Sequence, residues 1–155
     1  MLQRIQSLFL GLAALLMGIL LVVNIWDKVS GAEHVSLSAF RMVYSVNGEE
    51  KQTVFTFAIA ILGVISSTLS LVSLFTYKNR LRQMLFGLIN TLLIGATLGL
   101  IIYYSMEGEK MIAMSTKGSF GPGMIIPAIA LVCNMLANRF IRKDENTVRS
   151  ADRMR

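Results

Sequence analysis

Residues 54–105 read VFTFAIAILGVISSTLSLVSLFTYKNRLRQMLFGLINTLLIGATLGLIIYYS. Two uncharged runs, 54–77 and 83–104, flank the basic segment KNRLR, and each is longer than 20 residues. A helix rises about 1.5 Å per residue, so either run is long enough to cross a hydrocarbon core of about 30 Å. This part of the chain therefore predicts a transmembrane helical hairpin with a basic elbow.

The composition agrees with a membrane location. The 155-residue chain is 54% apolar and 15% charged, whereas globular domains are about 45–50% apolar and about 25% charged. The first apolar run is longer than the roughly 7–15 residues of a cleavable signal core, so we expect it to be retained. We expect an all-α integral membrane protein, a four-transmembrane-helix bundle that forms a single membrane domain over 1–155. Its spans are expected at about 5–26, 54–77, 83–104 and 120–140.

The loop between the first two spans carries one β signal. Asn47-Gly48 is a preferred pair for a two-residue type I′ turn, because both residues accept positive φ, and residues 42–46 alternate before it. The sequence therefore predicts a short extracytoplasmic β-hairpin over about 40–54. Two strands are only marginally stable in water, so we expect this hairpin to rest on the bundle or on the other outer loop.

The basic residues are unevenly distributed along the chain. Ten of the 15 Lys and Arg residues are Arg4, lie in the 78–82 elbow or follow residue 138, while five lie in the other loops, where six acids offset them. Cytoplasmic segments beside membrane spans are enriched in Lys and Arg. We therefore expect both termini in the cytoplasm and a basic helical tail at 141–155. No folded soluble domain remains to present a basic face, so the net charge of +6 does not indicate a nucleic-acid partner.

Small residues recur every four positions in the third span, at Gly87, Thr91, Gly95 and Gly99. In lipid, helices are held together by close backbone approach, which small residues permit. The stripe therefore predicts that a helix docks there. That helix can belong to this chain, to a second copy in a homodimer, or to another protein.

Polar residues inside the spans predict further packing contacts. Ser66 and Ser70 are one turn apart and share a face of the second span. Asn90 and Asn134 lie at similar depths in the third and fourth spans, which predicts a hydrogen bond between these helices. A pore lining for the serines and a ligand-binding role for the asparagines are the alternatives that stay open.

Residues able to carry out chemistry are scarce. No charged residue lies inside the core of any of the four predicted spans, whereas ion-coupled transporters depend on buried titratable groups. With one histidine and one cysteine, Cys133, the chain lacks His-Glu-x-x-His, Cys-x-x-Cys and any intrachain disulfide. We expect no enzymatic activity, no catalytic residue, no metal site and no cofactor.

Both ends of the chain resemble a known family. The matching residues are Met1-Leu2-Gln3-Arg4-Ile5-Gln6-Ser7 and, near the close, Ala137-Asn138-Arg139, Ile141, Lys143-Asp144-Glu145, Val148-Arg149-Ser150, Asp152-Arg153 and Arg155. They are similar to a family of small four-span inner-membrane proteins of Gram-negative bacteria, catalogued as a domain of unknown function. The resemblance implies four helices and a bacterial inner membrane, and it supplies no activity, cofactor or catalytic residue.

These observations favour a non-enzymatic multi-pass membrane protein. We expect its cytoplasmic basic ends to dock anionic membrane lipid or a membrane or cytoplasmic protein partner, because Lys and Arg near an anionic leaflet each contribute about 1 kcal/mol. The residues expected to dock it are Arg4, Lys78, Arg80, Arg82, Arg139, Arg142, Lys143, Arg149 and Arg153. The alternative is a small transporter or channel component, dimeric through the glycine stripe, with a water-accessible cavity lined by Ser66, Ser70, Asn90 or Asn134.

Overall fold

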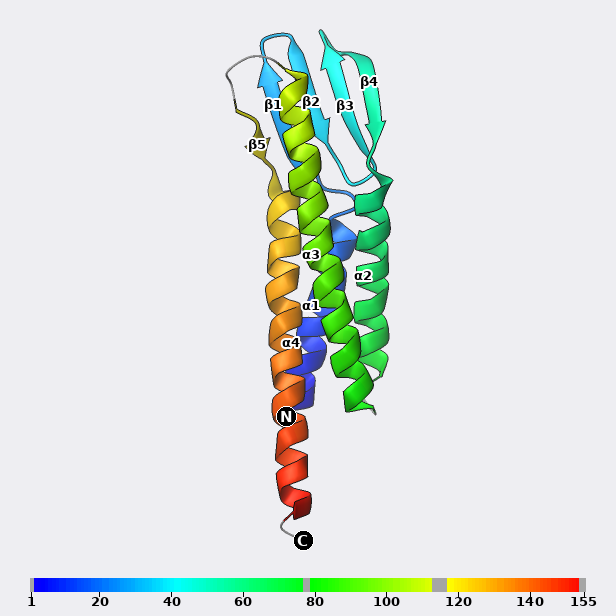
Figure 1. Cartoon of the computed structure of the whole chain (residues 1–155), viewed down its shortest axis with the longest axis vertical. Coiled ribbons are helices and arrows are strands. Elements are labelled where there is room, and N and C mark those ends of the chain that lie inside the picture. Colours follow the sequence, from blue (N-terminus) through cyan, green and yellow to red (C-terminus); the bar gives the residue numbers. More distant parts are fainter. Residues whose placement is uncertain (1, 77–78, 113–116, 154–155) are drawn as a thin grey trace.

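The computed structural model describes residues 2–76, 79–112 and 117–153, with side chains over 5–76, 79–112 and 117–147. These residues form an elongated molecule in which a helical bundle carries a β-sheet at one end (Figure 1). The helices are α1 (Leu2–Ile19), α2 (Phe57–Phe75), α3 (Arg80–Met111) and α4 (Pro122–Arg153). The strands are β1 (Trp26–Ser30), β2 (Glu33–Leu37), β3 (Arg41–Val46), β4 (Glu49–Phe55) and β5 (Ser119–Phe120).

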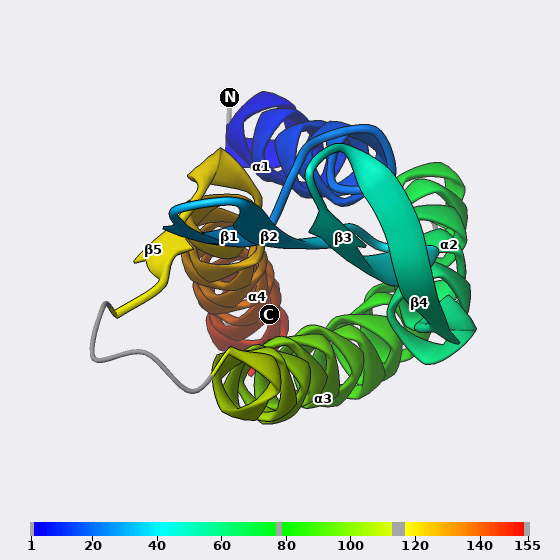
Figure 2. The same cartoon turned by 90° about the horizontal axis from the view of Figure 1, so that it is seen from above.

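The four helices form a closed ring. Helix α1 contacts α2 and α4, and α3 contacts the same two helices, as the end-on view shows (Figure 2). Buried residues of α3 alternate in steps of three and four, at Gly87, Asn90, Ile94, Thr97 and Ile101. A mean step of 3.5 residues is the spacing of left-handed, coiled-coil-like packing. The helices therefore share one continuous core along the bundle axis.

The strands form one antiparallel sheet in the order β4-β3-β2-β1-β5. Strands β3 and β4 are joined by Asn47 and Gly48, whose φ angles of 54° and 84° are those a type I′ turn requires. The hairpin predicted over about 40–54 is therefore present. It rests on β2, its neighbour in the sheet, and does not stand alone.

The expectation of an all-α four-helix bundle is wrong, because β1, β2 and β5 extend the hairpin to five strands. The sequence of β1 does not show the usual alternation of apolar inward and polar outward residues. Lys28 points inward and is 3% exposed, while Val29 points outward and is 63% exposed. A half-buried strand is recognised by apolar residues on its inner face, and here that pattern is inverted. Strand β5 has only two residues, too few to show any period. The fold is mixed α and β.

The buried Lys28 joins the sheet to the end of α3. Its Nζ donates hydrogen bonds to the backbone carbonyl oxygens of Glu109 and Ile112, both at 3.0 Å, and lies 3.5 Å from Glu109 Oε1. The last carbonyls of a helix have no helical donor, and a cation is favourable at this end of the helix dipole. Lys28 therefore caps α3 from a strand that is distant in sequence, and this explains why a lysine is tolerated inside.

Glycines allow α3 to approach the sheet closely. The Trp26 side chain is buried beside Gly108, where an added Cβ would lie 2.7 Å from Trp26 Cζ3 and 3.2 Å from Met42 Sδ. Gly118, which leads into β5, also lies against the indole ring. The indole thus fills a space that any larger side chain at these positions would occupy, and it holds α3 and the sheet together.

We expect Gly108→Ala to lower the free energy of unfolding by about 1–3 kcal/mol, as overpacking a filled core does. The added methyl group would meet Trp26 and Met42, both of which are buried. Thermal unfolding in detergent, followed by tryptophan emission, measures this directly because Trp26 is the only tryptophan of the chain.

Gly99→Ala is the matched control, since nothing lies within 4 Å of a Cβ at this position on the same helix. Alanine is favoured over glycine in helices by up to about 1 kcal/mol, so this variant should match or exceed the wild type in stability. Equal losses in both variants would show that the contact between Gly108 and Trp26 does not hold the sheet.

Candidate functional site

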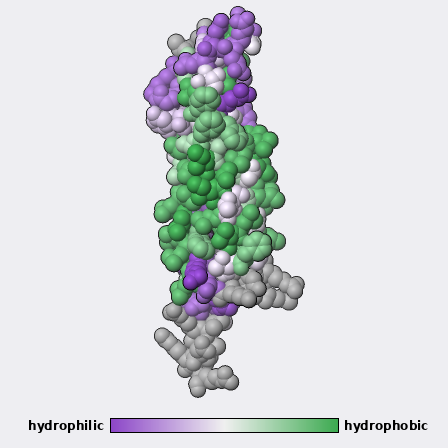
Figure 3. Space-filling model, turned by 90° about the vertical axis from the view of Figure 1, so that its right-hand side faces the viewer, coloured by the Kyte–Doolittle hydropathy of each residue, from purple (hydrophilic) through white to green (hydrophobic). Residues whose placement is uncertain are grey.

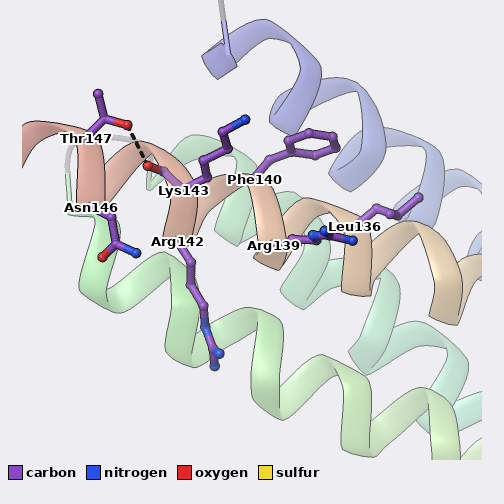
Figure 4. A pocket seen from close by; sticks show the side chains of 7 residues that line it. All are labelled: Leu136, Arg139, Phe140, Arg142, Lys143, Asn146 and Thr147. Carbon is purple, nitrogen blue, oxygen red and sulfur yellow. Dashed lines mark hydrogen bonds between the residues drawn. The ribbon is translucent and has the colours of Figure 1, made fainter.

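Two hollows lie side by side on α4, at the end of the bundle opposite the sheet. We call this end, where α1 and α3 begin, the basic end. The α1-side hollow, of about 660 Å³, is lined by Leu136, Arg139, Phe140, Arg142, Lys143, Asn146 and Thr147 (Figure 4). The α3-side hollow, of about 360 Å³, is lined by Leu88, Thr91, Leu92, Met135, Asn138, Arg139 and Arg142.

Arg139 and Arg142 line both hollows. They lie three residues apart on the outward face of α4 and so form a ridge between the two hollows. On one flank, Phe140 stacks on Phe9 of α1, with ring centroids 5.8 Å apart. On the other flank, Leu88 and residues near it on α3 form the far wall. Each hollow therefore combines an apolar wall with the same pair of guanidinium groups.

The two acids of α4 whose side chains are described, Asp144 and Glu145, contact Arg80 of α3. Asp144 Oδ2 lies 3.2 Å from Arg80 Nη2, Glu145 Oε2 lies 3.9 Å from Arg80 Nη1, and the Asp144 carbonyl accepts a hydrogen bond from Arg80. Arg139, Arg142 and Lys143 are exposed, and among the described side chains no carboxylate pairs with them. Among the side chains that the structure describes, the hollows therefore carry three positive charges that no carboxylate pairs with.

The structure brings together only part of the predicted docking set. Arg80 is paired with two carboxylates of α4, Asp144 and Glu145. Arg82 is exposed on α3 but lines neither hollow. The remaining predicted residues lie outside the described side chains: Arg4, Lys78, Arg149 and Arg153.

The pairing of Arg80 with Asp144 could have been read from the chain. Arg80 precedes Asn90 by ten residues on α3, and Asp144 follows Asn134 by ten residues on α4. When two antiparallel helices are in contact at one pair of residues, a residue some steps before the contact on one helix lies opposite the residue the same number of steps after it on the other helix. Nothing in the sequence signalled that Leu88, Leu92 and Met135 would line a hollow with the arginines.

A buried polar layer crosses the bundle above the hollows. Asn90 accepts a hydrogen bond from Ser66 Oγ at 2.7 Å and donates to Ser70 Oγ at 2.9 Å and to Asn134 Oδ1 at 3.1 Å. Asn134 in turn donates to the Gly87 carbonyl at 2.8 Å and to Thr91 Oγ1 at 2.9 Å. The predicted hydrogen bond between Asn90 and Asn134 is confirmed.

These polar groups satisfy one another. The side chains of Ser66, Ser70, Asn90 and Asn134 are fully buried, and each is bonded to another member of the layer or to the backbone. A buried polar group without a partner is costly, so this layer selects one alignment of α2, α3 and α4. The arrangement fits a packing role.

Only half of the glycine stripe packs within this chain. Gly87 lies against Asn138, whose side chain occupies the space a Cβ would need, and Thr91 bonds to the Gly87 carbonyl. Gly95 and Gly99 face open space. A step of four residues turns about 400° around a helix, so the stripe winds away from α4 as it rises. The homodimer predicted from the stripe stays a prediction.

The surface between the two ends is apolar. Three described helices are long and apolar enough to cross a membrane, Phe57–Phe75, Arg80–Met111 and Pro122–Thr147, and Ile5–Ile19 is a shorter apolar helix. The space-filling view shows the apolar surface as a band between polar residues near both ends (Figure 3). The hollows of the basic end lie at the edge of this band, where Arg139 follows the last uncharged residues of α4.

Fold and site together define a class: an apolar helical bundle with a small sheet at one end and exposed cations at the other. The chain belongs to the family described as Domain of unknown function (DUF4293), whose model matches residues 2–154. This confirms the resemblance to a family of unknown function. No curated protein matches the chain.

We expect Asn90→Leu and Asn134→Leu each to lower the free energy of unfolding by about 1–3 kcal/mol, because each leaves buried partners unsatisfied. The double variant should lose less than the sum of the two, since the first change already breaks the shared bond. Equilibrium unfolding in detergent of all four proteins measures the coupling. Strictly additive losses would show that the two side chains act independently.

Proposed function

We propose that this chain is a non-enzymatic four-span protein of the bacterial inner membrane whose basic end binds anionic phospholipid on the cytoplasmic side. One observation carries the proposal. Arg139 and Arg142 are exposed, have no acid partner among the described side chains, and stand at the edge of the apolar band beside the apolar wall of a hollow.

The apolar band supports the membrane location. Large hydrophobic side chains are exposed on all four helices, among them Leu15, Val64, Leu92 and Val132. Apolar patches of this extent are rare on soluble monomers, whereas hydrocarbon would solvate them. The apolar helix Ile5–Ile19 rises only about 22 Å, and the hydrogen-bonded turns over 20–23 lengthen its path toward the sheet end.

The charge distribution supports the orientation. The start of α1, the end of α2, the start of α3 and the end of α4 lie at the basic end (Figure 1). Ten of the 15 Lys and Arg residues belong to the sequence segments at these helix ends or beside them. Short loops rich in Lys and Arg remain in the cytoplasm. The basic end would then lie on the cytoplasmic side of a bacterial inner membrane, and the sheet would lie on the opposite side.

The residues that line the hollows suit a lipid ligand better than a protein partner. Leu88, Leu92 and Met135 line the α3-side hollow within the apolar band, so acyl chains would contact them from inside the bilayer. Arg139 and Arg142 follow at the depth of phospholipid head groups. A guanidinium group binds phosphate oxygens through two parallel hydrogen bonds, and basic pockets between spans on this side are suited to anionic head groups.

We expect the double variant Arg139→Gln/Arg142→Gln to bind phosphatidylglycerol about 30-fold more weakly than the wild type, since two cations contribute about 1 kcal/mol each. Native mass spectrometry of protein equilibrated in mixed micelles of phosphatidylglycerol and phosphatidylethanolamine measures the lipid retained. Raising the ionic strength should reduce the difference in phosphatidylglycerol affinity between the wild type and the double variant, because salt screens these charges.

Arg82→Gln is the matched control, since Arg82 is exposed at the same end and lines neither hollow. It should lower phosphatidylglycerol retention far less than the double variant. Equal retention of both lipids by the wild type would contradict the proposal. So would a protein captured from native membranes through Arg139 and Arg142 while lipid selectivity is unchanged in the double variant, because docking to a protein would then explain the cations.

A further inference from the structure

We infer that the lipid bound at the basic end is a two-phosphate, four-chain phospholipid of the cardiolipin type. It would straddle α4 with one phosphate on each side of the helix, an arrangement that we call the saddle. The inference rests on the proposed function and names the class of lipid. It comes from the pair of hollows that flank one helix and share Arg139 and Arg142.

The cations are arranged for two separate anions. In the close view, Arg142 extends from α4 toward α3, while Lys143 extends on the opposite side toward α1 (Figure 4). Arg139 lies one turn nearer the apolar band and lines both hollows. The three cations occupy five consecutive residues, a rise of about 6 Å along the helix. One phosphate on each flank can therefore have its own cation while Arg139 serves both.

The charge balance also favours two phosphates. Asp144 and Glu145 are directed to Arg80 on α3, so they do not neutralise the ridge. A single phosphodiester carries one negative charge and would leave two of the three cations without a counterion. Cardiolipin carries two phosphodiesters joined by one glycerol, and its charge comes closer to that of Arg139, Arg142 and Lys143.

Both hollows have an apolar wall on the bilayer side. Leu136 and Phe140 form it in the α1-side hollow, and Leu88, Leu92 and Met135 form it in the α3-side hollow. Each pair of acyl chains would lie against one wall. Two independent phosphatidylglycerol molecules would make the same contacts, but only a tethered pair gains from the linkage, because the second phosphate then binds at a raised effective concentration.

The test is a competition between tetraoleoyl cardiolipin and dioleoyl phosphatidylglycerol for the full-length protein, followed by native mass spectrometry. We expect cardiolipin to be preferred by about tenfold or more per molecule. This preference is smaller than the roughly 10²–10⁴-fold gain in affinity that linking two binding groups gives in solution, because lipids in a micelle are already concentrated. A preference near twofold, the statistical value for two phosphates, would overturn the inference.

Variants that fill one hollow at a time test the saddle itself. Leu92→Trp fills the α3-side hollow and Leu136→Trp fills the α1-side hollow. Each should reduce the cardiolipin preference to about twofold while one phosphatidylglycerol still binds. Leu85→Trp is the control, since Leu85 is exposed on α3 and lines neither hollow. Equal thermal unfolding temperatures would show that all three variants are folded.

The outcomes separate the two proposals. Binding of phosphatidylglycerol without a cardiolipin preference overturns the saddle and leaves anionic-lipid binding in place. No preference for either anionic lipid over phosphatidylethanolamine overturns both. A cardiolipin preference that survives both Leu92→Trp and Leu136→Trp places the lipid elsewhere and overturns the saddle.

Discussion

The alignment of α3 against α4 determines most of what this structure can do. It is set where Asn90 and Asn134 meet in the core, because a shift of either helix by one turn would break the bond between the two amides and separate the buried Asn134 from its partners on α3. With that alignment, Arg80 lies opposite Asp144 and Glu145 at the basic end. Asp144 and Glu145 are thereby paired, and within the described part of the chain Arg139, Arg142 and Lys143 have no carboxylate partner. A buried hydrogen bond thus controls which charges are available at the surface.

The sheet end depends on a similar coupling between distant segments. Helix α3 continues past the uncharged part of the chain, and its last turn ends against Lys28 and Trp26 of β1. The lysine supplies donors to carbonyls that lack them, and Gly108 allows the indole ring to approach the helix backbone. The sheet is therefore fixed to α3 and is not a separate module on a linker. Burial of Lys28 is favourable only because α3 ends at that position.

The parts that sequence reasoning predicted depend on local chemistry. Long uncharged apolar runs predict helices from the local sequence alone, and Asn47-Gly48 predicts its turn because both residues accept positive φ. The bond between Asn90 and Asn134 was predictable because charges mark the ends of both runs, and helical rise then gives the depth of each residue. The glycine stripe was less informative, since spacing alone does not say which turns of a helix face a neighbour.

The amino-acid sequence alone therefore determined the four helices, the β3–β4 turn and the clustering of cations at the chain ends and in the 78–82 elbow. Only the tertiary structure decided that β1, β2 and β5 complete a sheet. It also decided that Arg80 forms ion pairs with Asp144 and Glu145, and that Arg139 and Arg142 lie between two hollows. The reason is physical. Helix length and turn geometry depend on neighbouring residues, whereas an inward lysine or an unpaired arginine depends on partners far away in the chain.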